Sequence, residues 1–105
     1  MKEGVHTMKI RVFWEGVKVE RFSELREKEV INICDGCRLG CVNDLEFEKG
    51  SGKIVALLIP EEGKVWSFFG KCREYRVPWK CIRKIGDDII LVEVDTEDIL
   101  VVPDC

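Results

Sequence analysis

The sequence contains a single histidine, His6, and no hydrophobic run close to the length of about 20 residues that crosses a bilayer. Its first residues, MKEGVHTMKIRVFW, lack the apolar core and small-residue cleavage site of a signal peptide. Neither sign of charge dominates, because 17 Lys and Arg residues stand against 20 Asp and Glu residues. These absences predict a cytoplasmic protein without membrane insertion, and they argue against nucleic-acid binding through bulk charge.

The usual signatures of catalysis are also missing. A Cys–His nucleophilic pair would need His6 to reach a cysteine of the folded domain, and nothing in the sequence supports that contact. GSGK, residues 50–53, lacks the remaining spacing of a phosphate-binding loop and is better interpreted as a turn. Asp87 and Asp88 follow Ile85-Gly86 and precede an apolar strand, which is typical of a turn. We therefore expect no enzyme activity, no catalytic residue and no cofactor.

Cysteine, by contrast, is frequent, with six residues in a chain of 105. Three of them lie in CDGCRLGC, residues 34–41, around an Asp-Gly pair that suits a two-residue hairpin turn. Such a turn places Cys34 opposite Cys37, Asn32 opposite Leu39 and Val30 opposite Cys41. All three thiols then share one face of the hairpin.

Distance decides against a single metal site for these three thiols. Cys37 and Cys41 would lie about 13 Å apart at a strand rise of ~3.3 Å per residue, and thiolates that share one zinc must lie much closer. Cys34 and Cys37 alone would need two further ligands, and the predicted strand 74–79 separates the candidates Cys72 and Cys81. The favoured interpretation is plain thiols on a hairpin. Metal binding by Cys34 and Cys37, or a reversible disulfide between them, are the alternatives.

Short strands separated by Gly and Asp turns predict an all-β fold, a small barrel or a sandwich. A hairpin is expected at the N-terminus (10–14 and 17–20), and a helical turn that Ser23 could cap within 22–30. The run 53–60 is apolar enough to form the most buried strand. The other expected strands span 30–34, 38–48, 74–79, 88–94 and 98–103.

SELREKEVINICDGCRLGCVNDLEFEKGSGKIVALLIP, followed by FFG, EYRVPW and IRKIGDDIILV, resembles the PRC-barrel domain. More narrowly, it resembles the small sporulation-associated proteins of the YlmC/YmxH family, from about Phe22 to Val94. The resemblance implies a PRC-type β-barrel of about six short, mostly antiparallel strands that serves as a binding or assembly module without catalytic residues. We expect an N-terminal extension (1–20), the barrel domain (21–95) and a C-terminal extension with an edge strand (96–105).

Two surfaces are candidates for partner binding. Trp66, Phe68 and Phe69 lie in a long aromatic loop, which is either exposed as a protein interface or folded back as a plug for the barrel. The N-terminal hairpin and the C-terminal segment offer edge strands, and a homodimer could form by strand addition or exchange.

A basic segment suggests a different partner class, an RNA or the ribosome, by analogy with the PRC barrel of the ribosome-maturation factor RimM. Basic side chains alternate there with Tyr75 and Trp79, which could stack on bases. The favoured alternative is that the acidic segment 85–105 lies beside the basic one and neutralises it. The candidate nucleic-acid residues are Lys71, Arg73, Arg76, Lys80, Arg83 and Lys84.

Overall fold

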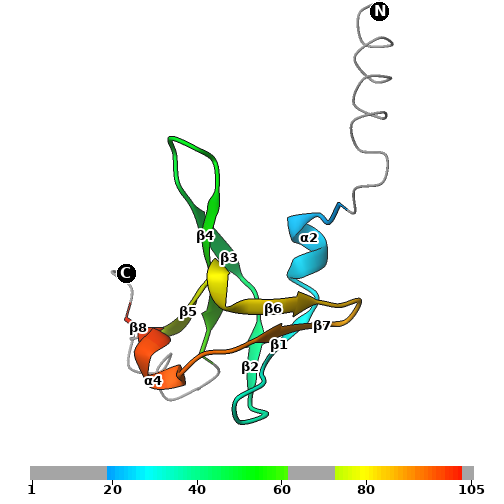
Figure 1. Cartoon of the computed structure of the whole chain (residues 1–105), viewed down its shortest axis with the longest axis vertical. Coiled ribbons are helices and arrows are strands. Elements are labelled where there is room, and N and C mark those ends of the chain that lie inside the picture. Colours follow the sequence, from blue (N-terminus) through cyan, green and yellow to red (C-terminus); the bar gives the residue numbers. More distant parts are fainter. Residues whose placement is uncertain (1–18, 62–72, 103–105) are drawn as a thin grey trace, which may run out of the picture.

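A computed structural model describes residues 19–61 and 73–102, which form two four-stranded sheets (Figure 1). The first sheet has the strand order β2-β1-β7-β6, and the second has the order β3-β4-β5-β8. The strands of the first sheet are β1 (Glu29–Asn32), β2 (Arg38–Cys41), β6 (Ile82–Ile85) and β7 (Ile89–Val92). Those of the second sheet are β3 (Asp44–Phe47), β4 (Ile54–Pro60), β5 (Glu74–Pro78) and β8 (Leu100–Val101).

The all-β class predicted from the sequence is confirmed, although the described residues form eight strands rather than about six. The two sheets are not closed by hydrogen bonds into one continuous barrel in the described part of the chain. Most neighbouring strands are antiparallel, but β1 and β7, which are far apart in the sequence, pair in parallel. The predicted hairpin over 10–20 lies almost wholly outside the described residues.

The chain passes between the sheets at two corners. The single strand predicted over 38–48 is wrong: it is divided into β2 and β3 by Val42 and Asn43. The side chain of Val42 is buried in the core, and Asn43 N–H donates to Leu58 O over 2.8 Å, so the strand turns here into the second sheet. A short 3-10 turn, η1 (Trp79–Cys81), makes the return from β5 to β6.

The hydrophobic core lies between the two sheets. Strand β4 contributes Ala56, Leu57 and Ile59, all fully buried, as expected for the most apolar run of the sequence. The cluster continues through both sheets and into both short helices. Its members are Leu25, Val30, Leu39, Val42, Leu57, Ile59, Val77, Ile90, Val92, Val94 and Ile99.

The predicted helical turn is present as α2 (Phe22–Leu25), but Ser23 does not cap it. The N-cap residue is Arg21, and Glu24 closes the first turn by accepting a hydrogen bond from Arg21 N–H over 3.1 Å. Glu24 therefore supplies the N3 carboxylate of a capping box that begins two residues earlier than a Ser23 cap would. The helix buries Leu25 and leads directly into β1.

The predicted strand over 98–103 is also wrong in its first two residues. Asp98 and Ile99 belong to a second helical turn, α4 (Thr96–Ile99), and only Leu100 and Val101 pair with β5. The Asp95 carboxylate accepts a hydrogen bond from Glu97 N–H over 3.1 Å, which is the N-cap arrangement that starts a helix.

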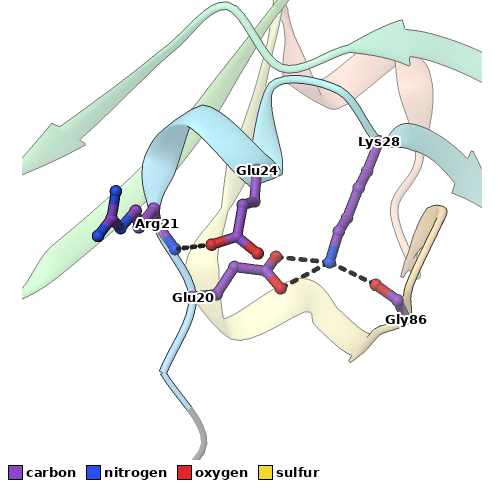
Figure 2. A network of polar contacts seen from close by, with 5 residues as sticks. All are labelled: Glu20, Arg21, Glu24, Lys28 and Gly86. Carbon is purple, nitrogen blue, oxygen red and sulfur yellow. Dashed lines mark hydrogen bonds and ion pairs between the residues drawn. The ribbon is translucent and has the colours of Figure 1, made fainter.

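A buried lysine fixes the start of β1. Lys28, with only 8% of its side chain exposed, contacts both carboxylate oxygens of Glu20 at 2.7 and 2.6 Å and Gly86 O at 2.5 Å (Figure 2). Its ammonium therefore has three acceptors, one on the turn between β6 and β7 and two on the segment before α2. The contact holds that segment against the first sheet.

Lys28→Met is expected to lower the free energy of unfolding by roughly 2 kcal/mol, because it leaves the partly buried Glu20 carboxylate without its cation. Lys84→Met, at an exposed position of β6, serves as the control and should change it by less than about 0.5 kcal/mol. Urea denaturation of the three proteins measures the difference. Equal stability of the two variants would show that the Lys28 contact contributes nothing.

Candidate protein-interaction site

The turn that carries the cysteines is wider than the two-residue turn predicted from Asp35-Gly36. Asn32 N–H donates to Cys37 O over 2.9 Å, and Gly36 N–H donates to Asn32 O over 2.8 Å, so Asn32 lies opposite Cys37 rather than Leu39. Val30 pairs with Gly40 rather than with Cys41. The predicted hairpin register is therefore wrong, and Cys34 lies inside the loop instead of opposite Cys37.

The buried Asn32 side chain explains this wider loop. Its Oδ1 accepts hydrogen bonds from Cys34 N–H and Val94 N–H, both over 3.2 Å, and its Nδ2 donates to Val94 O over 2.9 Å. Asn32 is 1% exposed, so these bonds satisfy a polar group that has no access to water. Binding Val94 holds the loop against the chain that follows β7.

The thiols of the loop are not linked to one another by a disulfide. Cys34, Cys37 and Cys41 are free and exposed, and Cys34 and Cys41 line two different surface hollows. Within residues 19–61 and 73–102, no three His, Cys, Asp or Glu side chains are grouped closely enough to hold a metal ion. Cys81 is half-buried in η1, and Cys72 lies outside the described residues.

The basic segment is largely paired with acids. Arg73 contacts Glu61 at 2.6 Å and Arg76 contacts Glu46 at 2.6 Å. Arg83 contacts Glu93 at 2.9 Å, and only this last pair uses the acidic C-terminal segment. Lys80 and Lys84 are exposed, and Lys71 lies outside the described residues. The paired arginines leave less positive charge for a nucleic acid than the sequence suggested.

Each edge strand carries a feature that disfavours pairing with another strand. The pairing of β2 with β1 is interrupted by a register shift, and Gly40 in β2 has φ +119°. Strand β3 carries Asp44 and Glu46, and β6 carries Arg83 and Lys84 beside a further register shift. Strand β8 is only two residues long. Within the described residues these features disfavour strand addition, whereas the N-terminal hairpin that was also expected to offer an edge to a homodimer lies almost wholly outside them.

The aromatic loop proposed as an interface, with Trp66, Phe68 and Phe69, lies outside the described residues. The hairpin of β3 and β4 projects from the body of the molecule as an arm (Figure 1), and it carries a different set of exposed apolar side chains. Phe47 is 59% exposed and Val55 is 40% exposed. Exposed large apolar side chains that lie together are typical of interaction surfaces.

The geometry of the arm brings these side chains together. Leu45 pairs with Leu57 and packs against the core. Phe47 pairs with Ile54, and a β-bulge at this point places both Ile54 and Val55 opposite a single residue of β3. Phe47 and Val55 thus form one exposed apolar surface, which we call the arm patch, and it continues the apolar face of the second sheet beyond the core. It surrounds an open hollow of about 460 Å³ lined by Leu45, Glu46, Phe47, Lys49, Val55 and Arg76.

The charges around the arm patch differ between its two sides. Lys49 and Lys53, in the turn of the arm, are exposed, and within the described residues neither takes part in an ion pair. On the other side, burial together with the charges of Asp44 and Glu46 raises the pKa of Glu74 above its ordinary value of 4.5. The turn of the arm therefore carries two lysines against one exposed carboxylate, Glu48, and is weakly basic, whereas the second sheet near β5 is acidic.

Sequence reasoning missed the arm patch. The signal in the sequence was the phenylalanine in LEFEKGSGK, since a Phe only three residues before the Gly50-Ser51 turn can extend past the sheet that would cover it. Strand alternation alone assigns Phe47 to the same face as Leu45 and hence to the core. The exposure of Phe47 depends on how far the arm projects beyond the core, and the alternation of residues along a strand does not reveal that distance.

The electrostatics of the cysteine loop give one prediction. The charge of the Asp35 carboxylate is the main cause that raises the pKa of the Cys37 thiol above its ordinary value; desolvation and a hydrogen bond to Asp35 raise it further. Asp35→Asn removes the charge but keeps an oxygen for Cys37 N–H, which donates to Asp35 Oδ1 over 2.9 Å. The pKa of Cys37 should fall, the thiolate fraction at pH 8 should rise, and alkylation should become faster.

Iodoacetamide labelling followed by peptide mass spectrometry measures this rate for each thiol. Cys41 is the internal control, because it lies in a different hollow from Asp35. An unchanged rate at Cys37, or an equal acceleration at Cys41, would contradict the assignment of the shift to Asp35.

Comparison of the sequence with known proteins identifies the family of this chain. The family model of the PRC-barrel domain matches residues 18–99. The chain is 43% identical over 72 residues to the probable sporulation protein YlmC of Bacillus subtilis, covering 69% of this chain and 89% of YlmC. It is 42% identical over 79 residues to the uncharacterized protein YmxH of the same organism, covering 73% of this chain and 92% of YmxH.

A third relative, an uncharacterized protein of Clostridium acetobutylicum, is 35% identical over 71 residues, which cover 68% of this chain and 80% of the relative. None of the helices in the described ranges combines the length and the apolar character needed to cross a membrane. The resemblance predicted from the motifs is confirmed: the chain belongs to the PRC-barrel family, among the YlmC and YmxH proteins.

Proposed function

We propose that the protein is a non-enzymatic assembly module of the cytoplasm with a role associated with sporulation. It binds an acidic and partly apolar surface of a protein partner with the arm patch of β3 and β4. The sporulation role is supported by the similarity to YlmC, which is named a probable sporulation protein. The binding role is supported by the exposure of Phe47 and Val55 on a hairpin that projects from the body.

The chemistry of the partner follows from the arm. Phe47 and Val55 favour an apolar side chain that fills the hollow between them, because burying apolar surface contributes about 25 cal/mol per Å². Lys49 and Lys53 favour carboxylates at the rim of the contact. A central apolar contact with a charged rim is the usual composition of a protein interface.

Binding to RNA or to the ribosome receives less support. Such a surface needs several cations free to contact phosphates, and Arg73, Arg76 and Arg83 are each engaged by a carboxylate. This alternative predicts salt-sensitive binding of RNA that Lys80→Glu and Lys84→Glu abolish. The arm proposal predicts that these two substitutions leave protein binding unchanged.

A photo-crosslinking amino acid at position 47 tests the arm in sporulating Bacillus subtilis. An aromatic crosslinker such as benzoylphenylalanine replaces Phe47 with little structural change, because that side chain is exposed. We expect adducts of one or a few discrete masses, formed through partner peptides rich in acidic and apolar residues. Lys49→Glu with Lys53→Glu in the same chain should reduce their yield at least ten-fold, because the rim charge is reversed.

The same crosslinker at Ile85 is the matched control, since this residue is an exposed apolar side chain on β6, outside the arm. Adducts of equal yield and identity from positions 47 and 85 would mean that the arm has no special role. The absence of any adduct from position 47 during sporulation would refute the proposal.

A further inference from the structure

A second surface of the same chain has the chemistry that the arm patch requires. A hollow of about 460 Å³ lies between the cysteine loop and the start of α4, and we call it the acidic hollow. Its lining carries three carboxylates and the largely buried apolar side chain of Val94. The residues that line it are Cys34, Asp35, Glu93, Val94, Asp95 and Thr96.

The two surfaces are complementary in charge. Arg83 partly neutralises Glu93, but no ion pair within the described residues engages Asp35 or Asp95. The oxygens of Asp35 and Asp95 that accept backbone hydrogen bonds fix both carboxylates at the hollow. Opposite them in charge are Lys49 and Lys53 in the turn of the arm, close in sequence to Phe47, and these two lysines outnumber the one carboxylate of that turn, Glu48.

The arm cannot reach the acidic hollow of its own chain. In Figure 1 the arm projects from one end of the molecule, whereas the loop between β1 and β2 and the helix α4 lie at the other end. Strand β8, which follows α4, pairs with Glu74 and Tyr75 of β5. On their other side, these two residues of β5 pair with Pro60 and Ile59 of β4. The arm begins at Ile54, about 20 Å along β4 from Pro60 at the usual rise per residue.

We propose that the arm patch of one copy docks on the acidic hollow of a second copy, so that the protein assembles with itself head to tail. This inference rests on the proposed function, because it names a second copy as the partner of the arm. The two surfaces are different, so the contact is heterologous and each bound copy still offers one free surface. Such contacts build open chains or closed rings rather than only dimers.

Analytical ultracentrifugation of the purified full chain over a concentration series tests the inference. We expect species larger than a dimer at 50 mM NaCl, with a loss at 0.5 M NaCl, because salt screens exposed charges. Phe47→Ser disables the arm, whereas Asp35→Asn with Asp95→Asn neutralises the hollow and keeps both backbone acceptors. Each variant alone should need at least ten-fold higher concentration to assemble.

Mixing the two variants gives the decisive result. The Phe47→Ser copy keeps its hollow and the Asp35→Asn/Asp95→Asn copy keeps its arm, so one contact remains and a 1:1 pair should form without larger species. Lys84→Met is the control and should assemble like the unchanged chain. Melting temperatures of all variants, measured in parallel, show that each is folded.

Three results would overturn the inference: a chain that stays monomeric at millimolar concentration, dimers that persist in both variants, or a mixture that remains monomeric. If the chain is monomeric while position 47 still forms adducts with another protein during sporulation, the proposed function stands and only the second copy is refuted. If position 47 forms no adduct in cells, the proposed function itself fails.

Discussion

The fold depends on the way in which the short central strand β1 is fixed at both ends. Lys28 joins its start to Gly86 O, and Asn32 joins its end to Val94 through two hydrogen bonds and to Cys34 through a third. A four-residue strand paired in parallel with β7 has no local turn to set its register. These two buried side chains set it, because any other register would leave a charge or an amide without partners in the core.

The surfaces that carry the proposals follow from this arrangement. Fixing Asn32 to Val94 holds the cysteine loop against the segment before α4, which creates the acidic hollow. The corner at Val42 turns the chain into the second sheet, from which the arm projects. Because the edge strands carry bulges, charges or few residues, side chains rather than free backbone edges are left for contacts with partners.

Electrostatics explain why a nearly balanced composition still gives distinct surfaces. The arginines of the basic segment are paired with Glu46, Glu61 and Glu93 from three different parts of the chain. The exposed lysines of the arm, and Asp35 and Asp95 of the acidic hollow, are left without such pairing within the described residues. The local distribution of charge, not the formal net charge of −3, therefore defines the surfaces that can bind.

The sequence by itself determined the all-β class, the PRC-barrel family, the position of most strands and the apolar run of β4, because these depend on local pattern and short motifs. Only the tertiary structure decided the register of the cysteine loop, the corner at Val42 and the helical turn α4. It also decided the partners of Arg73 and Arg76, and the exposure of Phe47. Each of these depends on contacts between residues far apart in the chain, such as Asn32 with Val94, which no local pattern contains.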